Sequence, residues 1–289
     1  MIEKHTFVFF GTSPLSIIVL LELEKAGLLP DLLVTTPDKP SGRKLAITPP
    51  MTKEWARAQG IRCIQPENFK NVPYELTITP SGGKWDLFIV ASYGKILPKR
   101  VFDLPKHGTL NVHPSLLPKL RGPSPIHGAI MNDDSEVGVT IMLLDEEMDH
   151  GPIVAQKRIS LKEWPLAHDV LHDLLASEGG SLLASTIPLW ISGGISLKEQ
   201  DHSKATYTKI LKKEDGFIYL KDDPYKNYLK ILAFGDKPGT HFFLTRGDIK
   251  VRLKIVEVDF KNGNLEIVTV IPEGRKEMKY VDFKRSFKE

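Results

Sequence analysis

Short apolar runs alternate with amphipathic segments along the first 150 residues of the chain. The runs are rich in branched and aromatic residues and lie next to Gly or Pro, which predicts buried strands at 6–10, 32–35, 61–64, 85–91, 109–113 and 137–144. Between them, helical spacing predicts helices that follow Ser13 or begin at Thr52 and Pro125. This alternation is typical of a doubly wound, mainly parallel α/β sheet of the Rossmann-like type, whose ligands bind at the carboxyl ends of the strands.

The hydrophobic pattern changes after a long predicted helix at residues 166–190. Gly193-Gly194 ends this helix, and residues 195–206 are predicted to form a polar linker. Beyond them, short apolar segments separated by turn residues predict strands at 242–244, 250–258 and 265–270. The sequence therefore predicts an α/β domain with its linker at residues 1–203. A small β-barrel domain of the OB type is expected at residues 204–289.

Composition narrows the class of protein. The chain has 289 residues, of which 41% are apolar and 26% are charged, and no apolar run approaches the roughly 18 residues that a membrane-spanning helix needs. The N-terminus lacks the features of a secretion signal. The single cysteine, Cys63, cannot form an internal disulfide and has no Cys or His at zinc-ligand spacing. We expect a cytoplasmic protein that binds no metal and no membrane, and we expect it to be a monomer.

The two predicted domains carry opposite net charge. From Lys204 to the end there are 19 basic and 13 acidic residues, a net charge of +6, whereas residues 1–203 carry −3. A split of this kind favours a C-terminal module that binds a polyanion. A solvated basic face without a partner explains it equally well.

The turn after the first strand, Gly11-Thr12-Ser13-Pro14, lacks the second and third glycines of a dinucleotide-binding turn. We therefore expect no nicotinamide cofactor. The turn is better interpreted as a sharp bend whose following helix can hold a small polar group.

The strand at 109–113 carries two polar residues, Asn111 and His113, at positions i and i+2. They share one face of the strand, about 7 Å apart, near its carboxyl end. A second apolar strand, 138–144, runs into an acidic loop that we expect at the same edge of the sheet, so that Asp149 in this loop faces His113.

An amide, an imidazole and a carboxylate together suit acyl transfer to an amine. Asn111 and a protonated His113 can stabilise the oxyanion that forms when nitrogen attacks a carbonyl. Asp149 can orient the imidazole and collect the proton that the nitrogen loses. Polar residues at strand ends are also common for purely structural reasons, and the residues by themselves leave that alternative open.

The flanking sequences resemble the folate-dependent formyltransferases. The stretch Asn111–Pro118 looks like their signature, and Val137–Met142 leading to Met148–Gly151 resembles their second motif. The resemblance implies that Asn111, His113 and Asp149 are catalytic and that 10-formyltetrahydrofolate donates the formyl group. It implies a donor pocket formed by the following residues: Val90, Tyr93, Gly94, Leu97, Ser115, Leu116, Leu117, Pro118, Leu144 and Asp145.

Three further stretches resemble those family members that act on methionine carried by initiator tRNA. They are Phe10–Ser13, the loop 36–44 with Thr48–Pro50, and Tyr207–Gly216. The resemblance implies that Lys39, Arg43 and Lys44 contact the tRNA, that residues 204–289 bind it, and that the methionine α-amino group is the acceptor. Such a group titrates near pH 7.7, so a useful fraction is neutral and nucleophilic at neutral pH.

Three other functions compete with this hypothesis. A sugar-nucleotide N-formyltransferase would share the trio and the donor but has no use for the loop that carries Arg43. A purine-pathway formyltransferase would not need the basic C-terminal domain. A non-catalytic RNA-binding protein that keeps an inactive folate fold is disfavoured because Asn111, His113 and Asp149 are all present.

Overall fold

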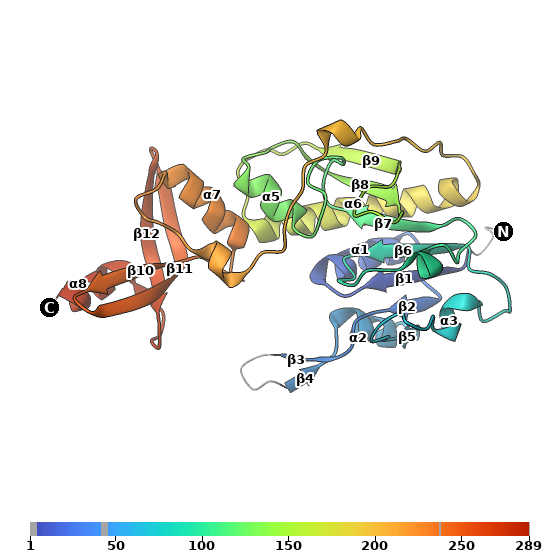
Figure 1. Ribbon diagram of the computed structural model, residues 1–289, viewed down its shortest axis with the longest axis horizontal. Coiled ribbons are helices and arrows are strands. Elements are labelled where there is room, and N and C mark those ends of the chain that lie inside the picture. The colour runs from blue at the N-terminus through green and yellow to red at the C-terminus, as the bar shows by residue number, and fades with distance from the viewer. Residues whose placement is uncertain (1–4, 42–45, 237, 289) are drawn as a thin grey trace. The chain divides into compact units, whose positions relative to one another are not determined.

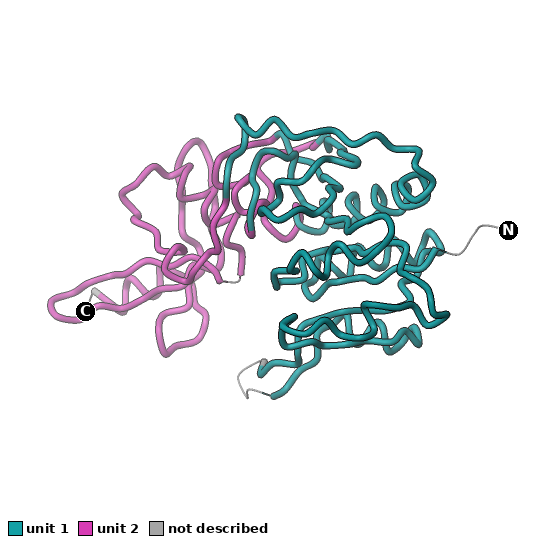
Figure 2. Tube along the Cα trace, turned by 45° about the vertical axis from the view of Figure 1, so that its right-hand side comes forward, with its two compact units in different colours: residues 1–122, 136–160, 172–207 teal, residues 123–135, 161–171, 208–289 magenta. Residues whose placement is uncertain are grey.

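The computed structural model describes residues 5–41, 46–236 and 238–288 (Figure 1). The chain divides into two compact units, shown in Figure 2. Unit 1 comprises residues 1–122, 136–160 and 172–207, and unit 2 comprises residues 123–135, 161–171 and 208–289. The assignment of residues 204–289 as a separate tRNA-binding domain stays a prediction.

Unit 1 is built on a seven-stranded sheet in the order β5-β2-β1-β6-β7-β8-β9. Its strands are β1 (Phe7–Gly11), β2 (Leu32–Val34), β5 (Arg62–Ile64), β6 (Leu87–Ala91), β7 (Thr109–His113), β8 (Val137–Leu143) and β9 (Ile153–Ile159). The first five strands of that order are parallel, β8 is antiparallel to β7, and β9 is antiparallel to β8. The predicted fold class, a mainly parallel α/β sheet, is confirmed.

Both faces of this sheet are buried. Phe7 and Phe9 of β1 pack into a core cluster that includes α1 (Pro14–Lys25) and α6 (His168–Ile191). The alternate residues Val8 and Phe10 pack into a second cluster on the other face. Because successive strand residues point to opposite faces, two apolar sets along one strand require a cover on each side, as a doubly wound sheet has.

The remaining helices of unit 1 are short. They are α2 (Met51–Ala58), α3 (Tyr74–Thr77), α4 (Lys99–Phe102) and the 3₁₀ turn His202–Lys204. As predicted, Ser13 precedes α1 and Pro14 occupies its first turn. Gly27 follows its end with a φ of 74°, a conformation in which glycine escapes the steric penalty of a side chain.

Two segments of unit 1 differ from the sequence-based prediction. The predicted loop 36–49 contains a small hairpin of β3 (Lys39–Ser41) and β4 (Ala46–Thr48). Strand β9 was not predicted, because three consecutive residues, Gln156 to Arg158, are polar and exposed, and its alternation is weak. It pairs with β8 along its whole length and completes the sheet.

Within the described ranges, α6 is the one helix long and apolar enough to cross a membrane by length and composition alone, although polar residues interrupt its apolar sequence. Ala176, Leu183 and Ile187 of this helix are fully buried in the core of unit 1. Such packing is typical of a core helix in a globular protein.

Unit 2 contains a four-stranded antiparallel sheet in the order β10-β11-β12-β13. Its strands are β10 (His241–Arg246), β11 (Ile249–Lys261), β12 (Asn264–Pro272) and β13 (Met278–Lys279). Its helices are α5 (Pro125–Met131), α7 (Pro224–Phe234), α8 (Tyr280–Lys288) and the 3₁₀ turn Lys213–Gly216. The three predicted strands all lie within longer ones. Helices α7 and α8 were missed, although Asp223 caps α7 and Pro224 begins it.

The segment predicted as a polar linker, 195–206, is part of unit 1. Lys198 forms a bridge with Ile153 of β9, and the Gln200 side chain is 4% exposed. Leu120 and Arg121 make further hydrogen bonds to Thr206. Gln200 is buried and hydrogen-bonded, whereas the other polar residues of this segment are exposed, as the prediction of a polar linker implies.

Candidate active site

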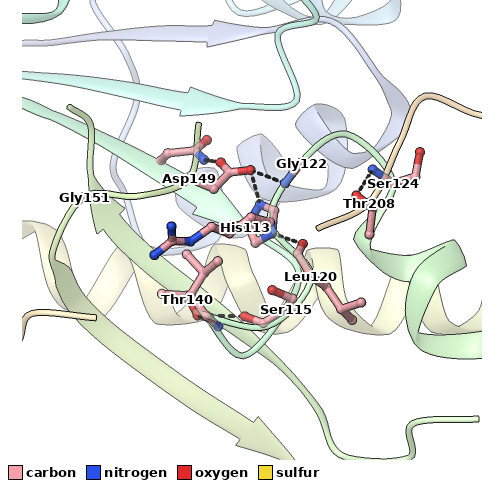
Figure 3. A network of polar contacts seen from close by, with 12 residues as sticks. His113, Ser115, Leu120, Gly122, Ser124, Thr140, Asp149, Gly151 and Thr208 are labelled. Carbon is pink, nitrogen blue, oxygen red and sulfur yellow. Dashed lines mark hydrogen bonds and ion pairs between the residues drawn. The ribbon is translucent and has the colours of Figure 1, made fainter. Parts of the chain in front are cut away.

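Strand β7 presents Asn111 and His113 on one face, as their spacing predicts. The Asn111 amide nitrogen lies 3.4 Å from Oδ1 of Asp149, and Nδ1 of His113 lies 3.6 Å from Oδ2 of the same carboxylate (Figure 3). His113 is 4% exposed. The structure therefore brings the three predicted catalytic side chains together, from two segments 36 residues apart.

The route by which Asp149 reaches this point differs from the prediction. Because β8 is antiparallel to β7, Leu143 at its carboxyl end lies opposite Leu110, near the beginning of β7. The expectation that both strands end at the same edge is wrong. The loop after β8 instead turns back to reach His113.

Two backbone features shape that return. Asp149 has a φ of 50°, in the left-handed region that residues with side chains seldom occupy. At Gly151 a Cβ would overlap the carbonyl oxygen of Leu143, so the chain can pass this close only as glycine. The loop is thus held in a conformation that its local sequence does not favour.

The imidazole of His113 lies between two acceptors. Its Nε2 is 3.0 Å from the carbonyl oxygen of Leu120, and its Nδ1 faces Asp149. At 3.6 Å, Nδ1 is within ion-pair range of the carboxylate oxygen but beyond hydrogen-bond distance. Asp149 accepts a further hydrogen bond of 2.7 Å from the backbone N–H of Gly122, shown in Figure 3. The carboxylate is therefore fixed by donors from two directions.

Four predicted donor-binding residues, Val90, Tyr93, Leu97 and Leu144, lie in one apolar cluster. The Tyr93 ring is fully buried against Phe10, and burial raises the pKa of its hydroxyl above the ordinary value. This hydroxyl has no hydrogen-bond partner among the described residues. Gly94 has a φ of 79° and open space where a Cβ would stand, so backbone is accessible there.

The segment Ser115–Pro118 is pinned to β8 and β9. Thr140 donates a hydrogen bond of 2.7 Å to the carbonyl of Ser115 and accepts one of 3.2 Å from the Leu117 N–H (Figure 3 draws the first). Gln156 donates to the Leu117 carbonyl at 2.9 Å. The Leu117–Pro118 peptide is cis, and Leu116 packs against Gly138. Hydrogen bonds between the Thr140 and Gln156 side chains and the loop backbone thus fix the loop beside His113.

The remaining predicted residues lie in separate places. Asp145 is held within its own loop, where its Oδ2 lies 2.6 Å from Nδ1 of His150. Lys39 is exposed on β3, opposite Thr48 of β4. Arg43 and Lys44 lie outside the described residues. Among the residues that the structure describes, no three His, Cys, Asp or Glu side chains gather in a way that would hold a metal ion.

Two residues that support the Asp149 loop were not predicted from the sequence: Gln200 contacts the loop directly, and Arg121 does so through Gln200. Arg121 is 1% exposed and hydrogen-bonds to Gln200, which in turn donates to the backbone of Asp149. Arg121 lies in the stretch that follows the Asn111–Pro118 motif, so its position was a usable signal. No such signal marks Gln200 in the sequence, because this residue lies 79 residues from Arg121 in a segment interpreted as a linker.

Comparisons with known proteins agree with this geometry. The model of the family described as formyl transferase matches residues 6–187. Methionyl-tRNA formyltransferase of Bacillus licheniformis is 35% identical to this chain over 302 residues, which cover 96% of this chain and 94% of the relative.

Two solved structures have a similar fold. Methionyl-tRNA formyltransferase from Clostridium thermocellum has a TM-score of 0.58 at 16% identity, covering 95% of this chain and 99% of its own. An N-formyltransferase from Helicobacter canadensis, solved with folinic acid and dTDP-3-aminofucose, has a TM-score of 0.62 at 18% identity, covering 91% and 95%. The match over residues 6–187 and the full-length relative show that this chain belongs to the formyl transferase family, alongside the methionyl-tRNA formyltransferases.

Proposed function

We propose that this protein transfers the formyl group of 10-formyltetrahydrofolate to the α-amino group of methionine on initiator tRNA. The convergence of Asn111, His113 and Asp149 carries the proposal, in a chain whose full-length relative is a methionyl-tRNA formyltransferase. The product, N-formylmethionyl-tRNA, serves translation initiation, and such a role would locate the protein in the cytoplasm.

The reaction begins when the neutral α-amino nitrogen attacks the formyl carbon. A C–N bond forms, and the carbonyl electron pair moves to oxygen. The Asn111 amide and the His113 imidazolium stabilise this oxyanion, while Asp149 orients the imidazole and takes or relays the proton that the amine loses. The intermediate then collapses, the bond to the folate nitrogen breaks, and that nitrogen regains a proton through water.

The donor would bind beside this trio. Val90, Leu97, Leu116, Leu117 and Leu144 would supply apolar contacts, and backbone groups near Gly94 and Pro118 would read the polar edge of the pterin. Tyr93 would contribute through its backbone, since its ring packs against the protein core. Ser115 and Asp145 would support the two loops, because each hydrogen-bonds within its own segment.

The acceptor would be held by basic residues. Lys39, Arg43 and Lys44 would contact the tRNA backbone near the charged end, and the net charge of +6 in residues 204–289 would attract the rest of the molecule. The α-amino acceptor distinguishes this proposal from a sugar-nucleotide N-formyltransferase. Likeness of fold to such enzymes at 18% identity does not select the acceptor.

A direct assay tests the proposal. The protein is incubated with 10-formyltetrahydrofolate labelled in the formyl group and, separately, with methionyl initiator tRNA, methionyl elongator tRNA and a dTDP-amino sugar. Label should pass to the initiator tRNA with the highest kcat/KM. Formylation of the sugar alone would overturn the proposal, as would transfer to neither tRNA.

A further inference from the structure

We propose that Gln200 is a positioning residue of the active site: together with buried Arg121, it holds the backbone of Asp149 so that the carboxylate stays against His113. This inference rests on the proposed function for its kinetic consequences. Its structural part concerns residues of unit 1 alone and can be tested without any substrate.

The carboxamide of Gln200 connects two otherwise separate segments. Its Nε2 donates to the carbonyl oxygens of Asp149 at 2.9 Å and Gly151 at 2.7 Å. Its Oε1 accepts from Nε and Nη2 of Arg121 at 3.2 and 2.7 Å. Because Arg121 can only donate and the two carbonyls can only accept, one orientation of the amide satisfies all four hydrogen bonds.

Arg121 is fixed well enough to serve as an anchor. Its backbone N–H donates to Thr206 at 2.8 Å, and its guanidinium also contacts the Tyr207 hydroxyl at 3.3 Å and Nδ1 of His202 at 2.8 Å. The side chain is 1% exposed. A guanidinium with donors in a rigid plane that contacts three side chains has little freedom to turn.

Asp149 is consequently held at two points. The N–H of Gly122, the residue after Arg121, donates to its carboxylate, and Gln200 donates to its backbone carbonyl. Its φ of 50° lies in the left-handed region, which Asp adopts more readily than most residues with a side chain but still less readily than glycine. Loss of the Gln200 contacts would let the loop relax and move the carboxylate away from Nδ1 of His113.

The same network continues to the donor side of the site. His202 stacks on His150 with ring centroids 4.1 Å apart and planes inclined by 5°, and His150 contacts Asp145. Both the catalytic and the donor-side ends of the loop 145–151 are thereby joined to Arg121. Gln200 lies between Arg121 and this loop and hydrogen-bonds to both.

The variant Gln200→Glu removes the hydrogen bonds that position Asp149 while it keeps the side-chain volume at residue 200. The glutamate keeps the volume and still accepts from Arg121, but its second oxygen faces two carbonyl oxygens without a hydrogen to share. We expect kcat for initiator tRNA formylation to fall by about tenfold to a hundredfold, because displacement of a reacting group by about 1 Å has effects of that order. KM for both substrates should change less than twofold, and the pH profile of kcat should shift. The control Glu199→Gln, at an exposed neighbour, should match wild type.

Two further measurements keep the inference falsifiable. In hydrogen exchange without substrates, amides of residues 148–152 should exchange at least tenfold faster in Gln200→Glu, with residues 109–113 unchanged. If that variant does not fold, Gln200→Asn, whose shortened amide cannot reach both sides, takes its place. Arg121→Lys should lower kcat as well. The double variant of Gln200→Glu with Arg121→Lys should have a kcat no lower than that of the less active single variant.

Wild-type kcat together with wild-type exchange in a folded variant would overturn the inference. A wild-type protein that formylates nothing would overturn the proposed function instead, and faster exchange at residues 148–152 would still support the role of Gln200 in holding the loop.

Discussion

The buried polar side chains at the candidate active site of unit 1 and the surface ion pairs of unit 2 lie in different environments. In unit 1, Arg121 and His113 are almost completely buried, and each hydrogen-bonds in a fixed direction. In unit 2, ion pairs such as Lys279–Glu257 lie at the surface, with both side chains more than half exposed. A buried charged group holds one geometry because any other leaves it unsatisfied, whereas exposed pairs contribute little one at a time.

The two units also differ in the size of their cores. The larger clusters of unit 1 cover both faces of its sheet, while unit 2 has a cluster of six buried residues, including Phe242, Leu253 and Val270. We therefore expect single substitutions at the buried polar site of unit 1 to lower turnover. Single substitutions in the core of unit 2 should lower the free energy of unfolding, and single surface charges should have only a weak effect on tRNA binding.

The largest expected effect is at Asp149. Asp149→Asn keeps the shape but removes the negative charge that faces His113, so kcat should fall by about 10²–10³ while KM for the folate donor stays the same. Steady-state formylation of initiator tRNA measures both constants. Asp103→Asn, at an exposed carboxylate, serves as control. Unchanged turnover in Asp149→Asn would remove the role assigned to this residue.

A core substitution tests the small cluster of unit 2. Leu253 is fully buried, and Leu253→Ala should lower the free energy of unfolding by about 2–5 kcal/mol through lost burial and a cavity. Urea unfolding measures the change, and hydrogen exchange should accelerate in residues 249–272 but not in β7. The half-exposed Leu220→Ala provides the matched control. Equal acceleration in both units would contradict the independence of their cores.

Exposed basic residues of unit 2 should contribute to tRNA binding in a salt-dependent way. Lys213, Lys221 and Arg275 are exposed, and changing each to alanine should raise KM for tRNA about twofold to threefold at low salt, with kcat unchanged. The dependence of log KM on log salt concentration should flatten with each substitution. Lys25→Ala, at an exposed lysine of unit 1, serves as the control variant. A salt slope identical to wild type in the triple variant would place the RNA contacts elsewhere.

A chemical probe of burial in unit 1 is the thiol of Cys63. Burial raises the pKa of its thiol from 9.0 to about 11, so at pH 8 its thiolate fraction should be about a hundredfold lower than in the unfolded chain. Alkylation by iodoacetamide, with and without urea, measures this ratio. The Cys63 thiol loses its proton at a lower pH in the unfolded chain than in the folded protein. Its contribution to the free energy of unfolding is therefore complete below pH 9 and is lost as the pH rises toward 11. Equal alkylation rates in both states would contradict the burial of this thiol.

Several local elements in both units were predictable to within a few residues. The strand 109–113 and the helix 125–131 match the structure, because burial imposes a period on the sequence within each element. Asn111 and His113 share a face for the same reason. Strand β9 escaped prediction because its alternation is weak. Helices α7 and α8 escaped it although their sequences carry usable signals, such as Asp223 and Pro224 at the start of α7.

The sequence by itself determined the alternation of strands and helices, the face that carries Asn111 and His113, and, through its motifs, the acidic residue that meets them. Only the tertiary structure decided that β8 runs antiparallel to β7, that the loop 144–152 doubles back to bring Asp149 to His113, and that Gln200 and Arg121 join across 79 residues. Periodicity records which side of an element is buried, whereas strand direction and contacts between distant segments depend on the packing of the whole unit and leave no local trace.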